Sequence, residues 1–271
     1  MSRTYSYVVG ANTSGGSEVP VPAGYRVTFE DYFTGSSVDT TKWNVRNNTY
    51  LSYEQSYLKS ANVTVADGKL AITPKLESAG GRSYTSGYID TIGKFSQRYG
   101  LFQVRAKVNT PIGTSQGIWP APLWLRGDTS VGEIDVVEAW GTSPGNARNY
   151  RLNSAVCSIH QNTNGGGGKV SNWLSANDGT DLSLDYHLYE ILWTPTSIVS
   201  RIDGVTKVTA TAANAPWAFS GTDYAGAFHL RVNVQVSDPT QASGTTWGGP
   251  DAYTEFGNPL LIDYIRVLEE A

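Results

Sequence analysis

Cysteine, histidine and charged residues are all scarce in this chain of 271 residues. The single cysteine, Cys157, excludes an intramolecular disulfide and a thiolate metal cluster within one chain. It lies in an alternating segment, 155–159, which predicts a small buried side chain rather than a reactive thiol. The three histidines, His160, His187 and His229, are too scattered for a metal-ligand motif. Metal-dependent catalysis is therefore not expected.

Long apolar runs and basic clusters are also missing. The chain contains no stretch of about 18 apolar residues, which is the length that a membrane-spanning helix needs. Residues 1–10 lack the basic and apolar regions of a secretory signal peptide. The net charge of −4 comes without a basic cluster, which argues against a nucleic-acid partner. We expect a monomer with no membrane or nucleic-acid partner and no signal peptide in this chain.

Turn-forming and aromatic residues are abundant instead, with 29 glycines, 12 prolines, 8 tryptophans and 16 tyrosines. Only 16% of the residues are charged, and no helix-periodic stretch rich in Ala, Glu, Lys and Leu is present. This balance favours strands. Residues 1–24 are predicted to be an irregular lead-in, and residues 25–271 a single domain, because no linker divides them.

Strand signals recur along the whole domain with turns between them. Asp67-Gly68 predicts a two-residue hairpin turn, because both positions tolerate positive φ. Segments 101–108 and 227–236 alternate between an apolar face and a polar, mostly wet face. A dozen or so strands without helices between them predict an all-β fold of two packed antiparallel sheets, a jelly-roll β-sandwich.

Segment 132–140 (GEIDVVEAW) places three carboxylates inside an otherwise apolar strand. On a regular strand Glu133 and Asp135 share a face, whereas Glu138 points to the opposite face. An unpartnered carboxylate in the core costs several kcal/mol or becomes protonated. One β-bulge at Val136-Val137 would absorb one residue of the strand, so that the residues after it change face. Glu133, Asp135, Glu138 and Trp140 would then all lie on one face.

Paired carboxylates on one face suit general acid/base and nucleophilic chemistry at a glycosidic bond. With the bulge, the Cα atoms of Glu133 and Glu138 lie about 13 Å apart, and their side chains can lean together. Retaining glycosidases need about 5–5.5 Å between the carboxyl groups, and inverting enzymes about 6.5–9.5 Å. Asp135 between them can orient the nucleophile and raise the pKa of its neighbours. The alternative is a solvated acidic face on an edge strand.

The spacing Glu-x-Asp-x-x-Glu resembles the signature of glycoside hydrolase family 16, in its laminarinase-like branch. The resemblance covers about residues 25 to 268, with several motifs in the family's order. They are 62–72 (NVTVADGKLAI), 84–87 (YTSG), 93–95 (GKF), 99–100 (YG), 105–107 (RAK), 117–125 (GIWPAPLWL), 187–195 (HLYEILWTP), 203–204 (DG) and 262–267 (IDYIRV).

The resemblance implies an open cleft across the concave sheet and retaining endo-hydrolysis of internal β-linkages in a polysaccharide, here a β-1,3-glucan. It makes Glu133 the nucleophile, Asp135 its supporting acid and Glu138 the acid/base, with no cofactor for catalysis. Such a substrate suggests an extracellular, secreted enzyme. The chain departs from the pattern at Tyr88, where the branch usually has Arg, and at Ser237-Asp238, where Gly-Gly is common.

These departures keep other substrates open, namely a β-galactan, an agar-type polymer or a capsule or wall polysaccharide cleaved by a phage-borne depolymerase. A non-catalytic glucan-binding module shares the fold but loses the carboxylates, and here all three are present.

Sugar rings bind to flat aromatics and fixed polar groups. Trp140 shares the face of Glu138, whereas the odd spacing of Trp119 and Trp124 would direct one of them into the core; the resemblance assigns both to the cleft. The expected substrate-binding residues are Trp119, Trp124, Trp140, His160, Asn233 and Gln235, with Arg231 and Trp247 as weaker candidates.

A structural calcium is a further expectation from the resemblance. Asp263 matches the acidic position near the C-terminal strand, and Glu30 is a possible companion on the convex side. Calcium binds six to eight such oxygen ligands, so two candidates define only part of a site.

Overall fold

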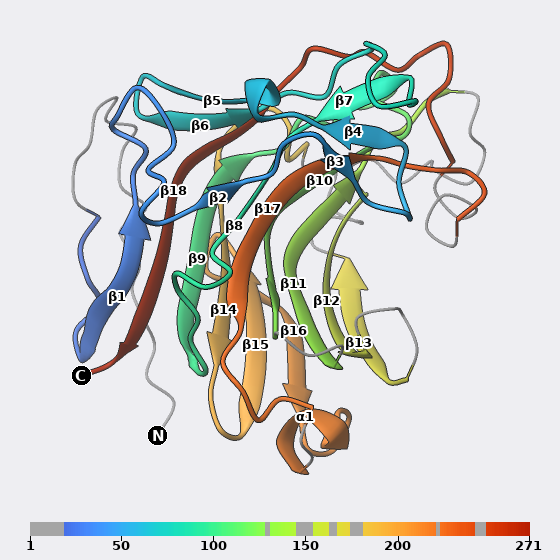
Figure 1. The fold of residues 1–271 in the computed structure, drawn as a ribbon. Coiled ribbons are helices and arrows are strands. Elements are labelled where there is room, and N and C mark those ends of the chain that lie inside the picture. The colour runs from blue at the N-terminus through green and yellow to red at the C-terminus, as the bar shows by residue number, and fades with distance from the viewer. Residues whose placement is uncertain are drawn as a thin grey trace.

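The computed structural model describes residues 19–127, 131–144, 154–162, 167–173, 181–220, 223–241 and 248–271. Their strands form two large antiparallel sheets that pack face to face (Figure 1). This is the jelly-roll sandwich that the sequence predicts. The boundary of the lead-in at residue 24 and the single-domain assignment stay predictions.

The eight-stranded sheet forms one layer. Its strands in spatial order are β16 (Val205–Thr211), β15 (Ser197–Ile202), β14 (His187–Trp193), β9 (Gly100–Lys107), β18 (Leu260–Glu270), β6 (Lys69–Ile72) and β5 (Val63–Ala66), and β1 (Tyr25–Asp31) also pairs with β18.

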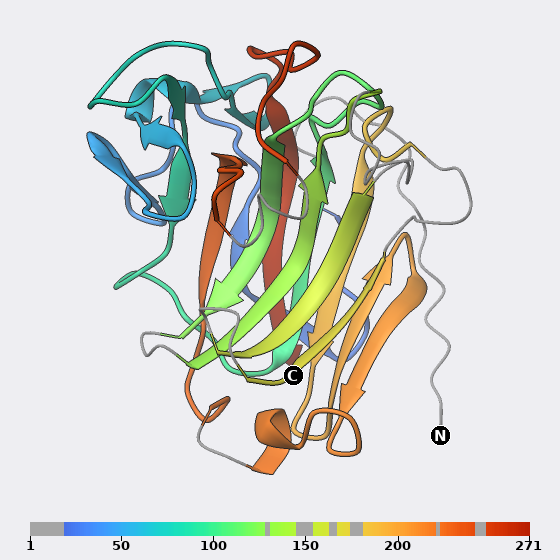
Figure 2. The same cartoon turned by 90° about the vertical axis from the view of Figure 1, so that its right-hand side faces the viewer.

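The seven-stranded sheet forms the other layer, and its strands curve across the molecule (Figure 2). Its strands in spatial order are β13 (Lys169–Trp173), β12 (Ser154–Asn162), β11 (Val131–Trp140), β10 (Ile118–Arg126), β17 (His229–Val236), β8 (Tyr88–Asp90) and β2 (Asn44–Val45). The carboxylate strand, β11, therefore lies near the centre of this sheet.

Short elements complete the described fold. A small sheet contains β3 (Thr49–Tyr50), β4 (Ser56–Leu58) and β7 (Tyr84–Ser86). The two helical turns are η1 (Ser60–Asn62) and α1 (Pro216–Ser220). No helix within the described ranges is long and apolar enough to span a membrane.

The core lies between the two large sheets and follows the predicted alternation. From β17, Leu230, Val232 and Val234 belong to the core cluster, whereas Arg231 and Asn233 lie on the other face of the strand. The predicted hairpin is confirmed: Asp67 and Gly68 have φ of 52° and 67° and connect β5 to β6.

The prediction that one face of segment 101–108 is mostly exposed to solvent is wrong at Gln103, whose side chain is only 1% exposed. Its side chain donates a hydrogen bond to Glu190 (2.6 Å) and accepts one from Arg266 (2.8 Å). Arg266 also donates to the carbonyl oxygen of Val19. Contacts with neighbouring strands and with the lead-in thus cover this face, which strand periodicity alone does not show.

Candidate active site

The predicted bulge is present in β11. Asp135 pairs with Ser158 and Glu138 with Val156, so three steps along β11 correspond to two along β12. Both valines between the carboxylates belong to the core cluster. The extra residue therefore lets the apolar side chains stay inside while Glu138 shares the outward face with Asp135.

A second bulge lies in β10. Ala121 pairs with Asn233 and Trp124 with Arg231, so again three steps match two. This bulge corrects the odd spacing of Trp119 and Trp124 and places both on the face that carries the carboxylates. The expectation that one of them lies in the core, based on spacing alone, is wrong because that spacing assumes a regular strand.

Glu138 lies against two tryptophans. Trp119 donates its indole N–H to Glu138 Oε1 at 3.0 Å and stacks on Trp140 with ring centroids 5.6 Å apart. These two rings and Val156 form a small apolar cluster separate from the main core. Burial first, then the charges of Asp135 and Glu133, raise the pKa of Glu138 well above its usual value.

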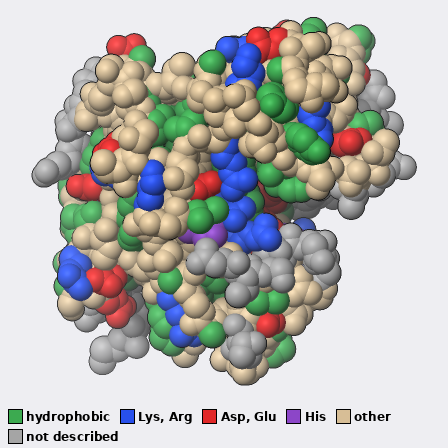
Figure 3. Space-filling model, viewed as in Figure 1, with side chains coloured by type: hydrophobic (Ala, Val, Ile, Leu, Met, Phe, Trp, Pro, Cys, Tyr) green, Lys and Arg blue, Asp and Glu red, His purple; other side chains and the backbone are tan. Residues whose placement is uncertain are grey.

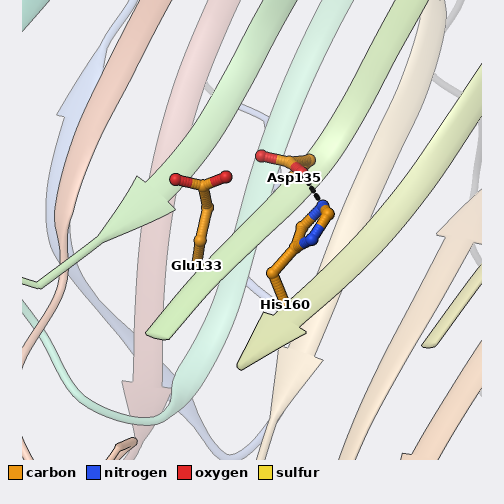
Figure 4. Close-up of side chains that lie close together, drawn as sticks. All are labelled: Glu133, Asp135 and His160. Atoms are coloured by element: carbon orange, nitrogen blue, oxygen red, sulfur yellow. Dashed lines mark ion pairs between the residues drawn. The ribbon is translucent and has the colours of Figure 1, made fainter. Parts of the chain in front are cut away.

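Glu133 and Asp135 lie on β11 opposite His160 of β12 (Figure 4). His160 Nε2 is 3.1 Å from Asp135 Oδ2. One polar atom from each of the three side chains lies within 4.8 Å of the others. Asp135 is 4% exposed, whereas Glu133 and His160 are half-buried. The histidine thus holds the carboxylate that lies between the two glutamates.

The beginning of β11 is fixed by Gly132 and Tyr224. Gly132 has a φ of +81°, and a Cβ there would lie 2.4 Å from the Phe228 ring. The buried Tyr224 hydroxyl lies within hydrogen-bond distance of the carbonyl oxygens of Glu133 (2.7 Å) and His160 (2.6 Å) and shares its one proton between them. Tyr224 ties β11 to β12 at the height of Glu133, and no pattern in the sequence indicates this role.

The electrostatic surroundings of the two glutamates differ. Burial and then Asp135 raise the pKa of Glu133, but Arg126, Arg231 and Lys169 oppose that rise. Near Glu138 the opposing influences are Lys169 and the Trp119 hydrogen bond. Three neighbouring carboxyl groups do not all ionise at neutral pH. The arginines favour the charged form of Glu133, so the rise of its pKa is opposed by more positive charge than the rise of the pKa of Glu138.

Asn233 and Gln235 carry buried polar atoms on the same face of β17 as Arg231. Trp124 donates its indole N–H to Asn233 Oδ1 at 2.9 Å. Asn233 Nδ2 and Gln235 Oε1 find no hydrogen-bond partner among the described residues. Such atoms are costly to bury unless something else binds them. The predicted substrate-binding residues inside the described ranges are thus gathered around the carboxylates, whereas Trp247 lies outside those ranges.

Four further side chains lie at this site, and only Arg231 among them is a candidate from the sequence. Arg126 pairs with Glu133 across β10 and β11, and only its place at the end of a strand could have indicated this. Arg231 and His229 share the polar face of β17. Glu133 also acts electrostatically on Tyr53, an exposed loop tyrosine that therefore lies near the carboxylates.

The expected calcium ligands do not fit a cation site. Asp263 forms an ion pair with Arg105 at 2.6 Å and has Lys69 at 3.9 Å, so both of its oxygens face positive charges. Glu30 pairs with Arg266 in the register of β1 and β18. Both oxygens of Asp263 thus face basic side chains rather than an open cation site, and we assign Asp263 no metal.

The chain belongs to the glycosyl hydrolases of family 16, whose family model matches residues 34–264. Hydrolases of this family need no catalytic cofactor. The match of the family model confirms the resemblance seen in the sequence, and the two-sheet fold agrees with it.

Relatives within the family include several glucanases. The chain is 31% identical to glucan endo-1,3-beta-glucosidase A1 of Niallia circulans over 93% of its own length, which spans 39% of that protein. It is 28% identical to the beta-glucanase of Rhodothermus marinus, covering 97% of this chain and 91% of the relative. The laminarinase catalytic domain of Thermotoga maritima superposes with a TM-score of 0.73 at 26% identity, over 91% of this chain and 99% of that one.

Proposed function

We propose that this chain is a retaining endo-β-1,3-glucanase that hydrolyses internal bonds of a polysaccharide. The observation that carries the proposal is the bulged β11, which sets Glu133, Asp135 and Glu138 on one face beside the stacked Trp119 and Trp140. The names of the Niallia and Rhodothermus relatives, an endo-1,3-beta-glucosidase and a beta-glucanase, support the substrate class.

In the first step Glu133 attacks the anomeric carbon while Glu138 donates its proton to the departing glycosidic oxygen. A covalent glycosyl ester forms on Glu133, and the shortened chain leaves as an alcohol. In the second step Glu138, now ionised, removes a proton from water, and the resulting attack releases the sugar with its original β configuration. Asp135, held by His160, orients Glu133 through both steps.

The remaining residues bind the sugar. Trp119, Trp124 and Trp140 lie on the face of the carboxylates with 6–7% of their surface exposed, and these exposed edges contact the C–H groups of the sugar. Asn233 Nδ2 and Gln235 Oε1, which have no hydrogen-bond partner among the described residues, bind hydroxyl groups of the sugar. A polymeric substrate of this size is found outside cells, so we propose that the enzyme acts extracellularly. We also propose that it acts as a monomer.

Azide rescue tests the two glutamate assignments, because the two roles fail differently. With an aryl glycoside that has a good leaving group, Glu138→Ala should form the glycosyl ester and then stall, and added azide should release a β-glycosyl azide. Glu133→Ala should form no ester, and azide should attack directly to give the α product. The opposite pair of anomers would exchange the roles of Glu133 and Glu138.

A substrate panel tests the polysaccharide. Product mass spectrometry after incubation with laminarin, lichenan, agarose, κ-carrageenan and a β-galactan should show oligosaccharides from laminarin. The wild-type product should appear first as the β-anomer. Degradation of a galactan with laminarin left intact would contradict the glucanase assignment but not the family. Binding of laminarin without cleavage would indicate a glucan-binding module instead.

A further inference from the structure

Two arginines lie next to Glu133 on the face of the sheet that carries the carboxylates, and neither forms an ion pair with another acidic side chain among the described residues. Arg126 at the end of β10 pairs with Glu133 on one side and with His229 of β17 on the other. Arg231, two residues along β17, lies on the same face, and both arginines are half-buried. Figure 3 shows Lys and Arg side chains gathered at the centre of the face seen in Figure 1.

Neutral groups hold Arg231 in place. Its Nε donates to His229 Nε2 at 2.8 Å, and one terminal nitrogen donates to the Tyr88 hydroxyl at 3.1 Å. The guanidinium carbon lies 4.8 Å from the centre of the Trp124 ring. These contacts use two of the five N–H donors of the guanidinium group and fix its plane. Within the described ranges the other three N–H donors have no hydrogen-bond partner, so these donors and the positive charge can bind a ligand.

The described ion pairs do not involve either arginine. Arg46, by comparison, pairs with Asp90 at 3.0 Å, and Arg105 pairs with Asp263. Arg126, Arg231 and Lys169 all lie close enough to Glu133 to oppose the rise of its pKa, so the positive charge at this site is concentrated beside Glu133.

We propose that Arg126 and Arg231 form a subsite for an acidic substituent, a carboxylate or a sulfate, on the sugar bound beside Glu133. The inference rests on the proposed endo-glucanase function and narrows its substrate to a glucan with anionic groups. A guanidinium fork matches the geometry of both anions. A neutral chain packed over the arginines would remove water from two charges without replacing it by a counter-charge. The ester on Glu133 removes one more negative charge, which favours an anion further.

Three substrates of matched length test this subsite, namely laminarin, laminarin partly oxidised to carboxylates at C6, and sulfated laminarin. The measured quantity is the ratio of kcat/KM on each acidic glucan to kcat/KM on laminarin. This ratio cancels any effect of Arg231 on the charge of Glu133. Wild-type protein should favour at least one acidic glucan, and the two acidic arms distinguish carboxylate from sulfate.

Variants at Arg231 should lower that preference. Arg231→Met should reduce the acidic-to-neutral ratio by about tenfold or more, since a charge-assisted hydrogen bond contributes on that scale. Arg231→Lys keeps the positive charge but loses the forked guanidinium group, so its ratio should lie between the ratios of wild type and Arg231→Met. Arg126→Met should also lower the ratio. Arg26→Met, in an exposed ion pair with Glu269, is the matched control and should leave the ratio unchanged.

Equal ratios in wild type and in both Arg231 variants would overturn the subsite, as would a wild-type preference for neutral laminarin. If none of the three glucans is cleaved, the glucanase proposal fails, and affinity electrophoresis in oxidised laminarin decides on the subsite. Retardation of wild type that Arg231→Lys weakens would support the subsite, and equal migration would refute it.

Discussion

Glu54 is a buried acid beside the cleft, and its replacement by glutamine should stabilise the protein in a pH-dependent way. The side chain is 1% exposed. Its Oε2 accepts hydrogen bonds from the backbone N–H of Ser56 (2.7 Å) and of Val236 (3.2 Å), and Oε1 accepts one from the Ser56 hydroxyl (2.9 Å). Glutamine can keep all three contacts, because its oxygen accepts from both amides and its NH₂ donates to the hydroxyl.

The magnitude follows from the pKa of Glu54, which burial raises from 4.5 to about 7. A raised carboxyl pKa means that the folded state binds the proton more tightly than the unfolded state. Its contribution to stability is therefore fully present below pH 4.5 and is lost as the pH rises to about 7. At about 1.4 kcal/mol per pH unit, the loss above pH 7 amounts to about 3 kcal/mol. Glu54→Gln avoids this loss.

Urea unfolding of both proteins between pH 4 and pH 9 measures the effect. The free energy of unfolding of Glu54→Gln should exceed that of wild type by about 3 kcal/mol at pH 8, and the difference should shrink toward pH 4. The other titrating groups are common to both proteins and cancel. Glu255→Gln at an exposed position controls for the loss of one negative charge. A difference that does not change with pH, or a variant less stable than wild type at pH 8, would refute the reasoning.

Three further predictions concern the site. Trp119→Phe removes the hydrogen bond that lowers the pKa of Glu138, so the alkaline limb of the kcat/KM profile should move to higher pH; an unchanged limb would show that Glu138 does not set it. Gly132→Ala should lower the free energy of unfolding by about 3 kcal/mol in denaturant titrations, because the added Cβ would clash with Phe228. Gly81→Ala is the control: it also has a positive φ, of +78°, but open space around it, so it should cost only about 1 kcal/mol. His160→Ala frees Asp135 and should lower kcat about tenfold in a reducing-end assay while KM changes little, and a change in KM alone would indicate a sugar contact instead.

The sequence by itself determined the fold class and the face of the carboxylates. Alternation along 227–236 and the turn at Asp67-Gly68 depend on local backbone geometry, so they could be read without neighbours. The bulge in β11 followed from parity, because burying Glu138 among core valines would leave a charge without a partner. The bulge could be predicted from one strand because the alternation of its apolar residues and the cost of burying a charged Glu138 both require it.

Only the tertiary structure decided which groups act on those carboxylates. The bulge in β10 that brings Trp119 and Trp124 to one face is defined by pairing with β17, and nothing in the strand's own sequence demands it. Tyr224 reaches the site from 91 residues beyond Glu133 in the chain. Asp263 has the residue type of a calcium ligand, but the cations of neighbouring strands occupy its surroundings. Electrostatic and hydrogen-bond partners depend on which strands become neighbours, and the sequence of a single strand does not contain that information.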